Sequence, residues 1–297
     1  MSDPSQTQPA ILSEVPAHAV SLLFDIEAPG PTVETLQVLK HSWESDLVVG
    51  IGPALTTLLG KSVEGLRPFP NLAEKAELAP ATDAALWLWV TGAEEQAVSA
   101  RASELAQKLA PAFSLRQQLS LFKYRDGRDL TGYEDGTENP RGERAIEVAT
   151  AEGAPGLAGG SFAFVQQWVH DLELFASFPQ GRKDHTFGRR LSDNEELEDA
   201  PQTAHVKRTA QESFEPEAFV LRRSMPYATD EIKGLLFLAF GRTLDPVEAL
   251  LGRMVGLEDG LVDALFDFTH PVSGATFWCP PLLDGSLDLR QLGRFDR

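Results

Sequence analysis

Apolar positions in the first half of the chain recur with two periods, which predict a mixture of strands and helices. Val33, Leu36 and Leu39 are spaced as on one face of a helix, and residues 94–109 are rich in the helix formers Ala, Glu and Leu. The order strand, helix, strand, strand, helix, strand is that of a ferredoxin-like unit. Strands are expected at 19–26, 47–55, 84–90 and 113–124, and helices at 32–45 and 94–109.

The second half of the chain repeats this pattern. Pro179 interrupts a helical stretch, and Pro246 is well placed to open a helix because the first turn tolerates proline. The sequence therefore predicts an α+β fold of two tandem ferredoxin-like units, with antiparallel sheets and helices packed outside them. Strands are expected at 161–169, 219–223, 234–240 and 275–279, and helices at 171–190 and 246–255.

Three segments follow from this organisation. Residues 1–16 are polar and contain proline, so a flexible N-terminal arm is expected there. Residues 17–145 would form the N-terminal ferredoxin-like domain, and residues 146–297 the C-terminal one. The boundary falls in a turn-rich loop between the two units, where a ligand pocket can form.

Composition narrows the class of protein. Of the 297 residues 42% are hydrophobic, which supports an ordinary buried core. No apolar run reaches the length of about 18 residues that a membrane span needs. The first ten residues are polar and lack the basic head and apolar centre of a secretory signal. The single cysteine, Cys279, excludes an intrachain disulfide and suits a reducing compartment, so a cytoplasmic protein is expected.

The charge balance is strongly acidic, with a formal net charge of −18 and a sequence pI near 4.7. A surface of that sign disfavours sequence-blind binding to nucleic acid. The acidic run 193–199 is interpreted as a solvated face, because it lacks the spacing of a calcium loop. The chain has no His-x-x-x-His or Cys-x-x-Cys pair and no Walker-type loop, which disfavours metal hydrolase and nucleotide chemistry.

The most informative stretch is the loop 132–142, Gly-Tyr-Glu-Asp-Gly-Thr-Glu-Asn-Pro-Arg-Gly, which sets one carboxylate, Asp135, among turn-forming residues. Its glycines permit backbone angles that other residues avoid, and Asn139-Pro140 stops a helix or strand from running through. Alone, such a loop is typical of an ordinary surface turn. A histidine at 205 and an Arg-Arg-Ser segment at 222–224 favour a functional interpretation instead.

The Gly-x-x-Asp-Gly pattern at 132–136 resembles the GxxDG signature of the dye-decolorizing peroxidases, a family of haem enzymes, and its extension to residue 140 strengthens the likeness. Residues 204–209 are similar to the proximal-histidine segment of that family, and residues 221–227 to its distal-arginine strand, in the same order and spacing. The compact length resembles the bacterial B-type subgroup. The resemblance implies haem b, iron protoporphyrin IX, held mainly by the C-terminal unit of a tandem ferredoxin-like pair.

On this resemblance, His205 is the ligand to the haem iron, the role that a neutral imidazole has in most peroxidases. A ligating histidine needs an acceptor for its second nitrogen. Asp263 is the expected acceptor, with Asp267 as the alternative. Lys207 and Arg208 are close enough along the chain to meet the haem carboxylates, and Arg208 is expected to bind the cofactor.

The same resemblance places peroxide activation on the opposite face of the haem. Asp135 would carry a proton between the two oxygens of hydrogen peroxide, and Arg222 would stabilise the negative charge that develops as their bond breaks. Neighbouring strand residues point to opposite faces, so Arg222 and Arg223 cannot both reach the site. Ser224 is a third catalytic candidate, at a position where many B-type relatives carry Asn. The loop residues expected to contact the cofactor are Gly136 and Thr137.

The expected activity is reduction of hydrogen peroxide coupled to oxidation of organic one-electron donors such as dyes and phenolics. The acidic field is expected to favour cationic or neutral donors over anionic ones. Because relatives commonly self-associate, a homo-oligomer is expected too. Two alternatives stay open from the sequence: a haem-handling, iron-releasing protein of the same fold, and a cofactor-free acidic interaction protein.

Overall fold

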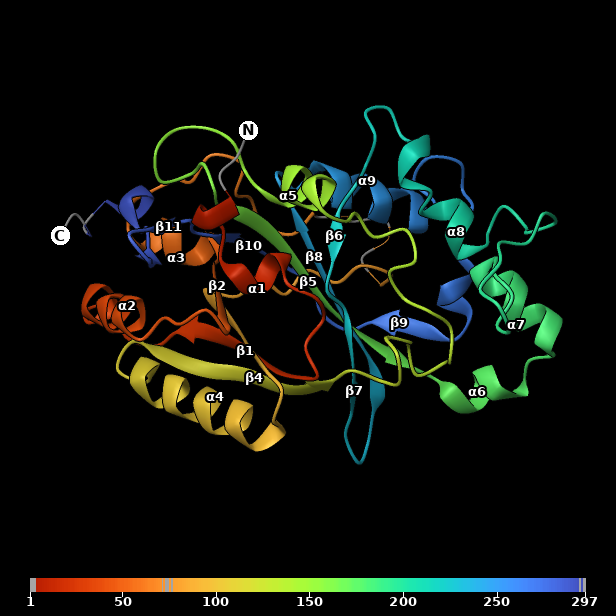
Figure 1. Cartoon of the computed structure of the whole chain (residues 1–297), viewed down its shortest axis with the longest axis horizontal. Helices are drawn as coiled ribbons and strands as arrows, with labels where there is room; N and C mark the ends of the chain where they lie inside the picture. The colour runs from red at the N-terminus through yellow and green to blue at the C-terminus, as the bar shows by residue number, and fades with distance from the viewer. Residues whose placement is uncertain (1–3, 71, 73–74, 76, 294, 296–297) are drawn as a thin grey trace.

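A ten-stranded sheet forms the centre of the computed structural model, which describes residues 4–70, 72, 75, 77–293 and 295 (Figure 1). Its main path has the order β4-β1-β3-β2-β10-β5-β8-β6, with β7 pairing with β8 and β9 with β5, and all these pairings are antiparallel. The strands are β1 (His18–Ile26), β2 (Leu47–Ile51), β3 (Leu86–Gly92), β4 (Phe113–Phe122), β5 (Ser161–His170), β6 (Leu221–Arg222), β7 (Met225–Ala228), β8 (Lys233–Gly241), β9 (Thr269–Pro271) and β10 (Ala275–Cys279), and a separate pair is formed by β11 (Leu282–Leu283) and β12 (Ser286–Leu287).

The strand order repeats between the two halves of this sheet. When the four main strands of each half are numbered along the chain, β4-β1-β3-β2 and β10-β5-β8-β6 both give the order 4-1-3-2. The halves join where β2 pairs with β10 through Ile51 and Trp278. The predicted tandem of ferredoxin-like units is therefore confirmed, and the two units share one continuous sheet.

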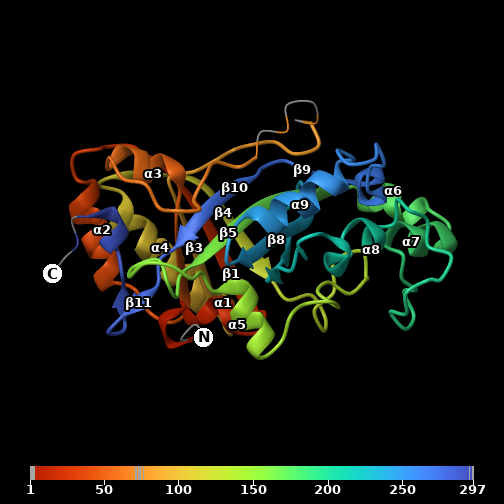
Figure 2. The ribbon, with the colours of Figure 1, turned by 90° about the horizontal axis from the view of Figure 1, so that it is seen from above.

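Helices lie at both ends of the sheet, with α2 and α4 beside the first half and α6, α7 and α8 at the opposite end in both views (Figures 1 and 2). Helix α4 buries Val98, Ala102 and Leu105, the stripe expected of an amphipathic helix. In the described part of the chain no helix is long and apolar enough to cross a lipid bilayer. The helices of four or more residues are α1 (Pro9–Leu12), α2 (Thr32–His41), α3 (Pro53–Leu58), α4 (Glu95–Leu109), α5 (Glu143–Ala149), α6 (Leu172–Ser177), α7 (Gln180–Phe187), α8 (His205–Arg208), α9 (Asp245–Met254) and the 3₁₀ helix η4 (Ala264–Asp267).

Strand β2 is shorter than the sequence predicts, because helix α3 starts inside the expected strand 47–55. The chain turns at Gly52, where a Cβ atom would lie only 1.9 Å from the carbonyl oxygen of Ala84. Pro53 then occupies the first turn of α3, where its missing N–H costs nothing. The apolar run therefore continues from a buried strand into a helix, and periodicity alone did not separate the two.

The expectation of a flexible arm is wrong for residues 4–16, while residues 1–3 lie outside the described part. Gln8 is almost fully buried, and its amide nitrogen donates to the carbonyls of Val49 and Pro280, both at 3.0 Å. Its side-chain oxygen accepts the amide of Val49 at 2.8 Å. Gln8 thus satisfies backbone groups of β2 next to the single β2–β10 pair. Polar composition predicted mobility here, but the polar side chain is used inside the protein.

The buried apolar clusters do not follow the domain boundary expected at residue 145. One apolar cluster combines α2, α4 and the first four strands with Leu287, Leu289, Leu292 and Phe295 from the end of the chain. Figure 1 shows this end, in dark blue, beside α2 and α3. The limits of the two domains stay a prediction, but residues after β10 contribute to the first core.

Candidate functional site

A cavity of about 480 Å³ lies in the second half of the molecule, with walls from the loop 129–138, helices α8 and α9, and strands β5, β6 and β8. Small-molecule and cofactor sites usually measure about 300–1,000 Å³, so this cavity has a suitable size. Asp135, His205 and Arg222 reach it from three separate parts of the chain. Its apolar wall includes Phe164, Val220, Phe237, Val247, Leu250 and Leu251.

Two glycines shape the loop that carries Asp135. Gly132 and Gly136 have φ angles of 91° and 76°, a region that residues with a side chain rarely adopt. The amide of Asn139 donates to the carbonyl of Gly136 at 3.0 Å and closes a tight turn directly after Asp135. The turn-rich sequence therefore gives Asp135 a defined backbone position.

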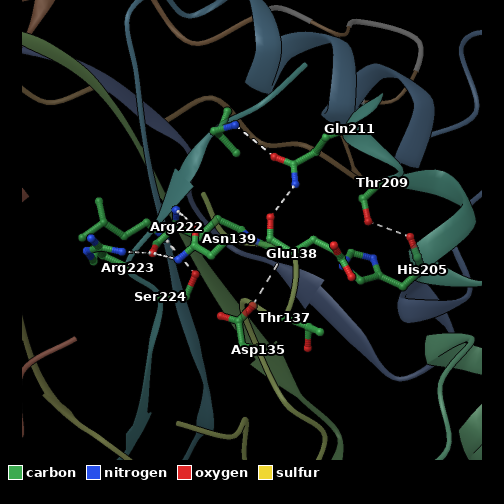
Figure 3. A network of polar contacts seen from close by, with 12 residues as sticks. Asp135, Thr137, Glu138, Asn139, His205, Thr209, Gln211, Arg222, Arg223 and Ser224 are labelled. Carbon is green, nitrogen blue, oxygen red and sulfur yellow. Dashed lines mark hydrogen bonds and ion pairs between the residues drawn. The ribbon is translucent and has the colours of Figure 1, made fainter. Parts of the chain in front are cut away.

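Asp135 faces Arg222 at one side of the cavity (Figure 3). Its Oδ1 lies 3.8 Å from Nη1 of Arg222, which is beyond hydrogen-bond distance. No hydrogen bond to the Asp135 carboxylate is made by the described residues, and the buried Nε of Arg222 likewise has no partner among them. Two ionic groups with unused hydrogen-bonding capacity therefore lie side by side.

Arg223 points away from the cavity on the other face of the strand, as the alternation of side chains predicts. Its guanidinium donates to the carbonyls of Ile11 and Leu12 at 3.1 and 3.0 Å. Burial lowers the pKa of Arg223 to about 10. The structure thus brings Arg222, and not its neighbour, to the cavity.

His205 is the first residue of α8, and its Nδ1 lies 2.7 Å from Oδ2 of Asp263. An ionised carboxylate can only accept, so Nδ1 is the donor and Nε2 of the neutral ring keeps a free lone pair. The Asp263 side chain is completely buried, and its other oxygen accepts the amide of Leu265 at 2.9 Å. Asp267, the alternative from the sequence, instead pairs with Arg182 at the surface. Of the two aspartates, the structure places Asp263 on His205.

Arg208 does not reach the cavity, contrary to the expectation that it contacts the cofactor. Its guanidinium donates to both carboxylate oxygens of Asp259 at 2.8 Å and to the carbonyl of Arg253 at the end of α9. A cation at a helix C-terminus is held by the free carbonyls there, which explains its direction. Among the described residues, the lysine and arginine side chains that line the cavity besides Arg222 are Arg189 and Lys207.

Arg189 and Lys207 are both paired with glutamates at the cavity. Arg189 lies 2.9 Å from Glu138 and 3.6 Å from Glu196, and Lys207 lies 2.6 Å from Glu196. Arg189 was missed in the sequence because it stands 16 residues before His205, outside every recognised motif. Both cations are neutralised by these glutamates here, so an anionic group in the cavity would have to compete with Glu138 and Glu196 for them.

The remaining expected residues divide between two spaces. Gly136 and Thr137, the loop residues expected to contact the cofactor, line the main cavity. Ser224 does not line it, but borders a smaller space of about 80 Å³ that also touches Asp135 and Arg222. The Ser224 hydroxyl accepts the amide of Leu238 at 3.4 Å. Ser224 therefore approaches the Asp135–Arg222 pair from behind the main cavity.

A second histidine–aspartate pair lines the cavity and was not predicted. Nε2 of His170 lies 3.0 Å from Asp129, and Nδ1 lies 2.6 Å from the Thr269 hydroxyl, whose only proton goes to the carbonyl of Val169. Both ring nitrogens of His170 are therefore engaged by oxygen atoms of neighbouring side chains. Burial favours a higher pKa for Asp129, but the bonds and charge of His170 and the donors of Thr131 outweigh it and lower that pKa.

A second unpredicted contact joins the motif loop to α7. The hydroxyl of Tyr133 donates to Asp184 at 2.5 Å, and its ring stacks on Phe187 with 4.0 Å between centroids. Burial and the Asp184 acceptor raise the pKa of Tyr133, so its hydroxyl keeps its proton. The partners lie 51 positions apart, and nothing in the sequence marks them as a pair.

The residues of this cavity fit the haem that the sequence resemblance implies. The apolar wall suits the faces of a porphyrin, and Nε2 of His205 makes no hydrogen bond within the described residues, so its lone pair can serve a metal ion. Lys207 and Arg189 would pair with the haem carboxylates in place of Glu196 and Glu138, and the Arg222 side chain lines the same cavity. These features are those of a cofactor site.

Comparisons with known proteins agree with this geometry. The family model described as "Dyp-type peroxidase, C-terminal" matches residues 126–284. A dye-decolorizing peroxidase of Rhodococcus erythropolis is 30% identical over 242 residues, which cover 78% of this chain and 71% of that protein. The matched segments include the loop of Asp135, the helix of His205 and the strand of Arg222.

Two solved structures show the same fold. That of a putative Dyp-type peroxidase from Shewanella oneidensis has a TM-score of 0.84 and 30% identity, and covers 100% of both chains. A DypB variant from Rhodococcus jostii, solved in complex with heme, has a TM-score of 0.80 at 23% identity, covering 92% of this chain and 95% of that one. Its likeness bears on the fold alone. The chain belongs to the Dyp-type peroxidases, a family of haem enzymes.

Proposed function

We propose that this haem peroxidase activates hydrogen peroxide with Asp135 and Arg222 and binds the haem iron through His205. The observation that supports these roles best is the convergence of the three side chains on one cavity, although they are 70 and 17 positions apart along the chain. Neither the haem-handling protein nor the cofactor-free interaction protein is favoured by any feature of the site.

His205 and the cations of the cavity would hold the cofactor. When bound, haem supplies the redox-active iron that accepts the oxidising equivalents of peroxide. Nε2 of His205 would be its protein ligand, because Nδ1 is engaged with Asp263. Lys207 and Arg189 would pair with the haem carboxylates, which takes over the role expected of Arg208.

Asp135 would move one proton within hydrogen peroxide. The ionised carboxylate accepts a proton from one peroxide oxygen and returns it to the other, which leaves as water when the O–O bond breaks. Arg222 donates hydrogen bonds to the oxygen that gains negative charge. Asp135 and Arg222 lie 3.8 Å apart without a hydrogen bond between them, so both side chains can form hydrogen bonds with peroxide.

The test of this proposal compares Asp135→Asn with the parent holoenzyme. We expect Asp135→Asn to keep the haem absorption spectrum while the second-order rate constant with peroxide falls by about 10²- to 10⁴-fold, the usual worth of a general base. Stopped-flow absorbance after mixing with peroxide measures it. Asp126→Asn, at an exposed position in the preceding loop, is the control and should react like the parent. A parental rate constant for Asp135→Asn would exclude the proton-transfer role.

The physiological setting that we propose follows from charge, cysteine content and the resemblance to the family. The net charge of −18 supports cationic or neutral organic donors such as dyes and phenolics. The lone cysteine, Cys279, is fully buried and supports a cytoplasmic location. Self-association into a homo-oligomer is carried over from the resemblance, and light scattering of the purified protein tests it.

A further inference from the structure

We propose that Asn139 is a positioning residue, which fixes Asp135 opposite Arg222 by binding the backbone of Arg222 with its side-chain amide. The inference rests on the proposed function of Asp135 and Arg222. Nδ2 of Asn139 donates to the carbonyl of Arg222 at 2.8 Å, and Oδ1 accepts the amide of Arg222 at 2.8 Å (Figure 3). The Asn139 side chain therefore hydrogen-bonds both the N–H and the C=O group of Arg222.

The position of Arg222 in the sheet explains why its backbone N–H and C=O need a side chain as a partner. Strand β6 ends the main path of the sheet, so one side of it is an edge. The amide of the next residue, Arg223, donates inward to Leu238 of β8. Backbone groups alternate in direction along a strand, so the N–H and C=O of Arg222 point outward, where no strand follows. Asn139 binds both of them as a neighbouring strand would, and the carbonyl also accepts Nη1 of Arg223 at 3.0 Å.

Asn139 also closes the turn that carries the Asp135 carboxylate, so it links the backbone of Arg222 to Asp135. Its own amide donates to the carbonyl of Gly136, the residue directly after Asp135. The Asp135 carboxylate receives no hydrogen bond from the described residues, so its position follows the backbone of the turn. A shift of Asn139 would therefore change the 3.8 Å separation between Asp135 and Arg222.

Gln211 supports the same loop from the other side of Asn139. Its Nε2 donates to the carbonyl of Glu138 at 3.4 Å, and its Oε1 accepts the amide of Val220 at 3.0 Å, two residues before Arg222. The longer first contact is the weaker of the two. The loop thus keeps an attachment to the approach to β6 when Asn139 is replaced, so the variants should fold with a displaced rather than a lost Asp135.

The two hydrogen bonds of the Asn139 side chain determine which variants test its role. Asn139→Ala removes both hydrogen bonds. Asn139→Asp keeps the shape and can still accept the Arg222 amide, but it cannot donate to the Arg222 carbonyl and places an oxygen against it. Thr91→Val is the control for losing one side-chain hydrogen bond to the backbone far from the site, because Thr91 donates to the carbonyl of Asp46 in the first half.

The experiment uses haem-loaded protein and three measurements. For Asn139→Ala we expect the rate constant with peroxide to fall by about 10- to 100-fold, because a misplacement on the order of 1 Å has that effect. The KM for a dye and the haem absorption spectrum should stay at parental values. Hydrogen exchange followed by mass spectrometry should be faster in peptides containing the Arg222 amide. Asn139→Asp should show the same changes, and Thr91→Val none.

A double substitution separates positioning from general stability. If Asn139 acts through Asp135, then Asn139→Ala should lower the peroxide rate constant less than twofold when it is added to Asp135→Asn. An equal loss in both backgrounds, or a parental rate in Asn139→Ala, would overturn the inference while the role of Asp135 stands. A parental rate in Asp135→Asn would instead overturn the proposed function and the role of Asn139 together.

Discussion

The imidazole of His205 donates to a carboxylate that has no contact with solvent, so at the scale of single residues Asp263 controls how the ring is oriented and how basic it is. Removing that acceptor should weaken the bond from His205 to the haem iron. For Asp263→Ala we expect haem to be lost to an excess of a haem-accepting protein about 10- to 100-fold faster than from the parent, the usual effect of losing such a partner.

Asp267 provides the matched control for this prediction. It lies four residues from Asp263, in the 3₁₀ helix η4, and its carboxylate pairs with Arg182 at the surface. Asp267→Ala should release haem at the parental rate. Equal rates for Asp263→Ala and the parent would show that the Asp263 contact does not govern the bond to haem.

The buried pair of His170 and Asp129 predicts how stability depends on pH. The pKa of Asp129 is lower in the folded chain than its ordinary value of 3.8, so the pair stabilises the fold fully above that value. This stabilisation is lost as the pH falls through the folded-state pKa. Urea unfolding at a series of acidic pH values should show the parent losing more stability than Asp129→Asn. Parallel curves for the two proteins would contradict the prediction.

The residues that carry the proposed chemistry could be found in the sequence, but their partners could not. Asp135, His205 and Arg222 each stand in a segment with a recognisable local pattern. The contacts of Arg208 with Asp259, and of Asn139 with Arg222, depend on where the chain returns 51 and 83 positions away. Local sequence contains no such distances. The sequence therefore indicates neither the pairing of Arg208 with Asp259 nor the contact of Asn139 with Arg222.

At the scale of elements, periodicity predicted the strands and helices that cross the core. Helix α4 and strand β5 agree with their expected ranges to within about one residue, because each has a long, regular pattern. The excursion 171–220 between β5 and β6 is less regular, with short helices that pack around the cavity. Residues of this segment contact the cavity and the loop that carries Asp135. Their apolar positions therefore show only weak periodicity.

The sequence does not predict helix α1 or the structural role of Gln8, the residue before it. Gln8 makes three hydrogen bonds to Val49 and Pro280, across the junction of β2 and β10. Gln8→Ala leaves these buried backbone groups without partners and should lower the free energy of unfolding by about 2–4 kcal/mol. Urea denaturation measures the change. Gln37→Ala, on the exposed face of α2, should have almost no effect, and equal stabilities for the two variants would refute a structural role for Gln8.

At the scale of the whole molecule, the acidic surface predicts which donors react fastest. With a net charge of −18, attraction should raise the association rate of a cationic dye and lower that of an anionic one. Added salt screens both effects. The kcat/KM for a cationic dye should therefore fall as ionic strength rises, while the value for an anionic dye of similar size should rise. Identical salt dependence for the two dyes would show that net charge does not steer donors.

The return of the chain end to the first core has a consequence for biosynthesis. Domains usually fold in order as they leave the ribosome, with the N-terminal one first. Here the first core includes Leu287, Leu289, Leu292 and Phe295, which are translated after the strands of the second unit. The nascent N-terminal half cannot complete its packing while these residues are still in the exit tunnel. Its final packing, and with it the contacts of Gln8 across the β2–β10 junction, must wait until residues 287–295 have left the tunnel.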